Sequence, residues 1–120
     1  MLQTRLAATL REALRTRDKA AVAALRSALA AIANAEAVSP LPARANRASS
    51  EHIAGAAPGL RAAEVPRRQL SEEEVTQVVR REITERQEAA GQYAGAGHHE
   101  RAARLRTEAE VLLAALDAAA

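Results

Sequence analysis

Apolar residues recur at helical spacing along the first third of the chain. The two series are Leu2, Leu6, Leu10 and Leu14, followed by Val22, Leu25, Leu29 and Ile32. Steps of three and four residues place each series on one face of an α-helix. Between them stands Asp18, a favourable N-cap residue. The pattern therefore predicts helices near 2–15 and 18–36.

A strong helix-start signal occurs at Ser71. Ser71 and Glu74 have the spacing of a capping box, and three glutamates fall in the first turn. The residues expected to be buried after this start are Val75, Val78, Val79 and Ile83, and those expected to be exposed are Arg80, Arg81, Glu85 and Arg86. Glu82 and Arg86 are also spaced as a helix-supporting ion pair. A helix near 71–93 is predicted.

A last helix is predicted near 98–118, after a turn rich in glycine. Its apolar series comprises Leu105, Ala109, Leu112 and Leu116, widened by Leu113. Residues 37–69 show no helical period and contain all four prolines, so a long loop containing Pro and Gly is expected there. The predicted fold class is all-α, with two antiparallel helical hairpins (1–36 and 70–120) packed together in a single domain of residues 1–120.

The composition favours this fold class and excludes several functions. Aromatic residues make up 1% of the chain, so it lacks the stacking platform of proteins that read single-stranded bases. The absence of Cys excludes disulfides, thiol catalysis and Cys-based zinc sites. His98, His99 and Glu100 would need further ligands to hold a metal, and adjacent His side chains point apart on a helix. We expect no metal, no cofactor and no catalytic residues.

The sequence shows no uncharged apolar run of membrane-spanning length, so no transmembrane helix and no membrane partner are expected. Residues 1–17 are rich in Arg and nearly free of acidic side chains, which resembles a mitochondrial transit peptide. The alternative is a permanent first helix. We favour that alternative because the apolar spacing continues into the next helix. The absence of Cys fits a cytoplasmic protein, and the cytoplasm is the expected location.

Charge is distributed unevenly along the chain. Residues 1–68 carry 11 basic and 5 acidic side chains, a net charge of +6, whereas residues 69–120 carry 6 basic and 10 acidic ones, a net charge of −4. The predicted nucleic-acid-binding residues are Arg11, Arg15, Arg17, Lys19 and Arg26. Such cations contact phosphates, but rows of surface Arg are also common without that role. The polarised charge equally suits docking of a protein partner or of a second copy.

Three groups of residues together resemble the GatB/YqeY-like proteins. They are Arg17-Asp18-Lys19 with Leu25-Arg26 and Ala31-Ile32-x-Asn34-Ala35-Glu36; Leu70-Ser71-Glu72-Glu73-Glu74-Val75 with Val79-Arg80-Arg81-Glu82-Ile83-x-x-Arg86; and Ala96-Gly97 with Ala103-x-x-x-x-Glu108-Ala109-Glu110-x-x-Leu113. Each is ordinary in a helical protein, and their order and spacing carry the resemblance. Members with the full domain continue into a C-terminal three-helix part, and many have a short turn in place of 37–69. His98 stands where the family usually has Arg. The resemblance implies a short member that holds the N-terminal helical subdomain.

The resemblance implies a link to tRNA metabolism. The related module is the tail of the B subunit of the tRNA-dependent amidotransferase, which handles tRNA while other domains perform the chemistry. It implies a non-catalytic accessory module that binds RNA weakly, with tRNA as the expected partner. Two alternatives stay open. One is a helical protein-interaction module without a nucleic-acid role, and the other is a component with carbon–nitrogen ligase activity that uses glutamine as the amido donor.

Overall fold

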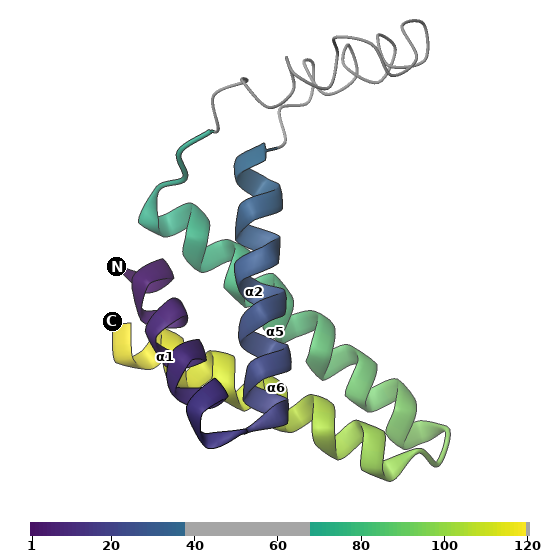
Figure 1. The fold of residues 1–120 in the computed structure, drawn as a ribbon. Coiled ribbons are helices and arrows are strands. Elements are labelled where there is room, and N and C mark those ends of the chain that lie inside the picture. Colours follow the sequence, from purple (N-terminus) through teal and green to yellow (C-terminus); the bar gives the residue numbers. More distant parts are fainter. Residues whose placement is uncertain (38–67, 120) are drawn as a thin grey trace, which may run out of the picture.

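The computed structural model describes residues 1–37 and 68–119, which form four helices and no strand (Figure 1). The helices are α1 (Leu2–Thr16), α2 (Lys19–Ala37), α5 (Glu72–Gly95) and α6 (His99–Ala119). The all-α prediction is confirmed for these residues, and each helix lies within two residues of its predicted bounds. The loop predicted at 37–69 lies almost wholly outside the described residues.

A two-residue connection turns the chain from α1 into α2. Arg17 adopts the left-handed conformation, with φ 60° and ψ 37°. The N–H groups of Arg17 and Asp18 donate to the last carbonyls of α1, those of Leu14 and Ala13, at 3.3 and 3.0 Å. The Asp18 carboxylate accepts the N–H of Ala21 at 3.1 Å. The predicted N-cap is confirmed, since Asp18 satisfies an N–H group at the start of α2.

Helix α2 packs against α1, α5 and α6, as each described helix packs against the other three. Its fully buried side chains are Ala24, Leu25, Ala28 and Ile32. The alanines keep this face narrow, which lets neighbouring helices approach closely. The residues that pack around α2 include Leu2 and Leu6 of α1, Val79 and Ile83 of α5, and Leu112 of α6. Helices α5 and α6 lie side by side, and the half that ends in their connecting turn extends beyond α1 and α2 (Figure 1).

Two leucines predicted to lie on apolar faces are exposed. Leu14 is 45% exposed, and Ala13 is buried near that end of α1. A strict four-residue step turns the helix by about 40° more than a full circle each time, so the series leaves the core face after three steps. Leu113 is 36% exposed because it lies about 100° around α6 from the buried Leu112.

The start of α5 also organises the start of α1. The predicted capping box is confirmed, since the Ser71 hydroxyl accepts the Glu74 N–H at 3.1 Å and the Glu74 carboxylate accepts the Ser71 N–H at 3.0 Å. Helix α1 has no side-chain cap at its own first residues. Instead the Glu72 carboxylate accepts the Leu2 N–H at 3.1 Å. The negative charge of Glu72 thus stabilises the N-terminus of a helix 70 residues away in the sequence.

By length and hydropathy, α2 is the one described helix that could cross a membrane, with a mean hydropathy of 1.2 over its 18-residue window. The sequence pattern did not indicate this helix as a candidate. Its buried face packs against all three other described helices. An apolar, alanine-rich helix is also what the centre of a small helical core requires.

We expect Ser71→Ala to lower the free energy of unfolding by about 1 kcal/mol, because the Glu74 N–H loses its acceptor. Ser71→Asp should retain most of the stability, since Asp also caps helices. Thermal or urea unfolding of the three proteins measures the difference. An Ala variant as stable as the parent would contradict a stabilising role for this cap.

The capping box predicts a pH dependence that belongs to Glu74. The Ser71 N–H, with a smaller contribution from Arg68, lowers the pKa of the Glu74 carboxyl. A pKa that is lower in the folded chain stabilises it above the unfolded pKa of about 4.3, and this contribution is lost as the pH falls through the folded value. Between about pH 5 and pH 3, the free energy of unfolding should therefore fall less in the Glu74→Gln variant than in the parent. If the free energy of unfolding fell equally with pH in the parent and the variant, the assignment to Glu74 would be wrong.

Candidate nucleic-acid interface

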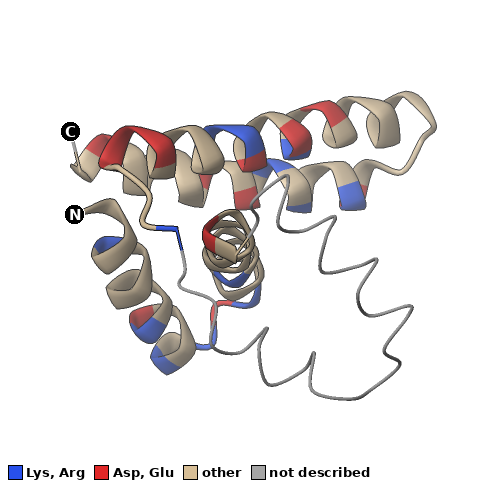
Figure 2. Cartoon of the chain, turned by 90° about the horizontal axis from the view of Figure 1, so that it is seen from above, with Lys and Arg blue, Asp and Glu red and all other residues tan. Residues whose placement is uncertain are grey.

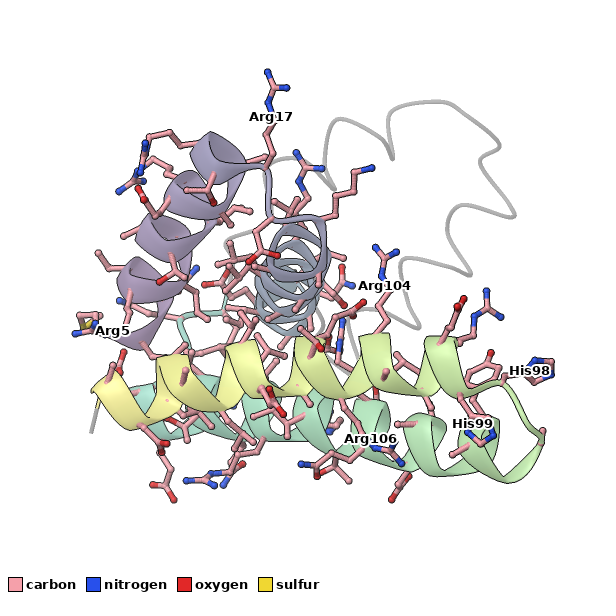
Figure 3. The ribbon with its side chains drawn as sticks, turned by 90° about the horizontal axis from the view of Figure 1, so that it is seen from below. Arg5, Arg17, His98, His99, Arg104 and Arg106 are labelled. Atoms are coloured by element: carbon pink, nitrogen blue, oxygen red, sulfur yellow. The ribbon has the colours of Figure 1, made fainter. Side chains whose placement is uncertain are left out.

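The predicted binding residues all lie on the exposed outer side of α1, α2 and their connection. Arg11 and Arg15 are one turn apart on α1, on the side opposite its buried leucines. Lys19 and Arg26 lie on the side of α2 opposite its buried residues. The side chain of Arg17 extends outward from the connection (Figure 3). Basic segments accordingly mark the end of α1 and the start of α2 in Figure 2.

Arg15 differs from the other four cations because it is held by an acid. Its Nη2 and Nε atoms lie 2.5 and 3.1 Å from the two carboxylate oxygens of Glu12. This pairing lowers the pKa of Glu12 and raises the pKa of Arg15. Within residues 1–37 and 68–119, none of the other four predicted binding residues forms an ion pair. Four cations are therefore free to meet an anion there, while Arg15 must first leave Glu12.

A buried ionic network joins α2, α5 and α6, and sequence reasoning missed it. The Arg86 guanidinium donates to Glu82 and Glu108, each at 3.0 Å, and the Ser27 hydroxyl of α2 donates to Glu82 at 2.6 Å. The side chains of Arg86, Glu82 and Glu108 are only 12, 14 and 11% exposed. The Glu82–Arg86 pair is confirmed, but the prediction that Arg86 is exposed is wrong. Its charge is buried because two carboxylates compensate it.

The sequence did contain a signal for this network. Counting in steps of three and four from Val79, the buried face of α5 passes through Glu82, Ile83 and Arg86 and reaches Ala90. On α6, Glu108 directly precedes the buried Ala109. Charged residues that interrupt apolar faces on two helices, with opposite signs, are candidates for a buried pair.

Near the outer half of the α5–α6 pair, a hollow of about 410 Å³ opens beside this network. It is lined by Tyr93, Glu100, Arg101, Arg104, Leu105 and Glu108. The Arg101 guanidinium lies 5.1 Å from the centre of the Tyr93 ring, and its Nη1 is 3.4 Å from the Tyr93 hydroxyl. The Nε of Arg104 is 3.6 Å from Glu108. The hollow thus presents two guanidinium groups on one face of α6.

The histidines of the α5–α6 turn lie in solvent. His98 and His99 are exposed, and the His98 and Tyr93 rings form an edge-to-face pair with their centres 6.0 Å apart. In the part of the chain that the structure describes, no group of three or more metal-ligating side chains is close enough to hold an ion. Four glutamates already have structural roles. Glu72 and Glu74 cap helices, and Glu82 and Glu108 pair with the buried Arg86.

A second hollow, of about 350 Å³, runs between α1 and α6. Its lining combines alanines and Val111 with the charged residues Arg5, Glu12 and Asp18. The hydroxyl groups of Thr9 and Thr16 donate to carbonyls of α1, so these side chains add little free hydrogen-bonding capacity to the groove. It is a shallow apolar surface that is distinct from the outer basic side.

A comparison with models of protein families finds one match. The sequence model of a family described as Yqey-like protein matches residues 52–117. The match covers α5 and nearly all of α6, and it begins within the undescribed segment. No curated protein and no solved structure matches the chain.

The buried network makes a prediction about stability. Arg86→Met should lower the free energy of unfolding by about 3–5 kcal/mol, because it leaves two buried carboxylates without a counter-charge. The combined variant Glu82→Leu, Arg86→Met, Glu108→Leu should recover most of that loss, since no charge stays buried. Urea unfolding measures both changes.

The matched control for this prediction is Arg106→Met, which removes the same charge from an exposed position of α6. It should change the stability by less than about 0.5 kcal/mol. An Arg86→Met protein as stable as the Arg106→Met protein would show that Arg86 does not hold the helices together.

Proposed function

The chain belongs to the YqeY-like protein family, and we propose that it is a non-catalytic accessory module that binds tRNA weakly in the cytoplasm. In this proposal the binding residues are Arg11, Arg15, Arg17, Lys19 and Arg26. The proposed module is a single domain of two helical hairpins, 1–36 and 70–120, joined by the segment 37–69.

The observation that carries the proposal is the set of exposed cations at the α1–α2 connection. Arg11, Arg17, Lys19 and Arg26 have no ion-pair partner among the described residues. Cations held on rigid helices at several points suit the spaced phosphates of a folded RNA. With a single Tyr in the chain, affinity would rest on phosphate charge and RNA shape and would tolerate many sequences.

The proposal of a non-catalytic role is supported by the structural use of four glutamates. Glu72 and Glu74 satisfy helix N-termini, while Glu82 and Glu108 compensate Arg86. General acid–base chemistry needs carboxylates with different environments that face a substrate cleft. With no Cys in the chain, a thiol nucleophile for transfer of nitrogen from glutamine is also absent. Any carbon–nitrogen ligase activity would then belong to a partner.

The test is the binding of a tRNA transcript to the parent and to the Arg15→Ala, Arg17→Ala, Lys19→Ala variant across a salt series. The variant should bind all RNAs more weakly by a similar factor. The slope of log affinity against log salt should flatten by roughly two units, about one per lost phosphate contact. Arg15 should contribute less than the other two because Glu12 already neutralises it.

Two controls separate local contacts from overall charge. Arg5→Ala removes a cation near the other end of α1 and should leave the affinity close to that of the parent. Glu12→Gln frees Arg15 and should strengthen binding, whereas Glu110→Gln changes the net charge equally on α6 and should strengthen it less. A parent that binds no tRNA at low salt would refute the proposal and favour the protein-interaction alternative.

A further inference from the structure

We infer that the phosphate-binding surface continues from α2 onto α6, where Arg104 and Arg101 provide a second set of contacts. The inference rests on the proposed function, because it names where the same anionic partner would continue along the molecule. The partner would lie in the corner between α2 and the outer half of the α5–α6 pair.

A chain of short contacts connects Ser27 of α2 to Arg104 of α6. Ser27 of α2 directly follows Arg26, and its hydroxyl donates to Glu82 at 2.6 Å. Through Arg86, Glu82 is linked to Glu108 by two contacts of 3.0 Å. Arg104 then lies 3.6 Å from Glu108. Because each of these links is a direct contact, Ser27 and Arg104 lie at the same three-helix junction. The network beneath them fixes α2 and α6 relative to each other.

Arg104 is held loosely enough to change partner. Its side chain is 57% exposed, and its 3.6 Å contact to Glu108 is longer than a hydrogen bond. The other carboxylate oxygen of Glu108 already accepts from Arg86 at 3.0 Å. Because Arg86 still compensates the buried Glu108, a phosphate can replace Glu108 as the partner of Arg104 without leaving Glu108 unpaired.

Arg101 is already oriented for binding. Its guanidinium lies against the Tyr93 ring at 5.1 Å, and such cation–π contacts hold the planar group while leaving N–H donors free. Arg101 and Arg104 line the same hollow of about 410 Å³. The charged side chains of the network and the hollow are three arginines (Arg86, Arg101, Arg104) and three glutamates (Glu82, Glu100, Glu108).

The direction of the side chains supports a shared surface. Arg104 extends from α6 toward the side on which Arg17 extends from the α1–α2 connection (Figure 3). Arg106 extends from the opposite side of the same helix (Figure 3). Arg106 is exposed and has no ion-pair partner within the described ranges 1–37 and 68–119. Arg104 and Arg106 are therefore two arginines on the same helix that face different sides of the molecule.

The experiment compares Arg104→Gln and Arg106→Gln in the full chain, with a tRNA transcript as the probe over a salt series. Arg104→Gln should weaken binding and flatten the salt slope by about one unit, which is the effect of one lost phosphate contact. Arg106→Gln should bind as the parent does. Arg104→Lys, which keeps the charge, should retain most of the affinity, and circular dichroism should show equal helix content in all three variants.

The failures of the two proposals are distinguishable. If the parent binds tRNA and the Arg15→Ala, Arg17→Ala, Lys19→Ala variant is weakened, but Arg104→Gln and Arg106→Gln bind alike, the extension onto α6 is wrong and the proposed function stands. If the parent binds no tRNA at low salt, both are wrong. A parent that binds polyglutamate but not tRNA would overturn the inference in favour of an acidic protein partner.

Discussion

Arg86 lies where α2, α5 and α6 meet, and its guanidinium is bonded to carboxylates of two helices at 3.0 Å. One of those carboxylates also accepts the Ser27 hydroxyl of α2. Apolar packing alone allows helices to slide, because its energy depends on buried area and not on direction. Hydrogen bonds to a buried guanidinium have fixed geometry. The orientation of α2 over the α5–α6 pair, and with it the direction of the exposed cations, therefore depends on this network.

Local signals in the sequence predicted the helices and several of their ends. Asp18 and Ser71 were identifiable because a cap acts on a backbone group within three residues. The cap that Glu72 provides for α1 spans 70 residues and has no local signal. Arg86 was assigned to solvent by its charge, and its pairing with Glu82 and with Glu108 of α6 explains its burial. Leu14 is exposed because a strict four-residue step is longer than one helical turn, so the series of leucines gradually leaves the core face.

The basic residues show what sequence can predict about a binding surface. Their type and clustering were evident, and the structure places them on outer faces of α1 and α2. The pairing of Arg15 with Glu12 is a three-residue helix contact that the sequence also contained. The relation of α2 to Arg104 depends on how the helices cross, so no local pattern could indicate it. A surface that combines cations from α1, α2 and α6 would favour a folded anionic partner over an extended strand, because its contacts lie in different directions.

The most direct test of this account is a titration of the isotope-labelled full chain with a tRNA transcript, followed by backbone amide chemical shifts. The largest shifts are expected around Arg17 and Lys19, along the outer side of α2, and near Arg104. Amides beside Arg106 and along the groove floor near Val111 should shift little. Largest shifts at the α1–α6 groove, or equal shifts beside Arg104 and Arg106, would contradict it.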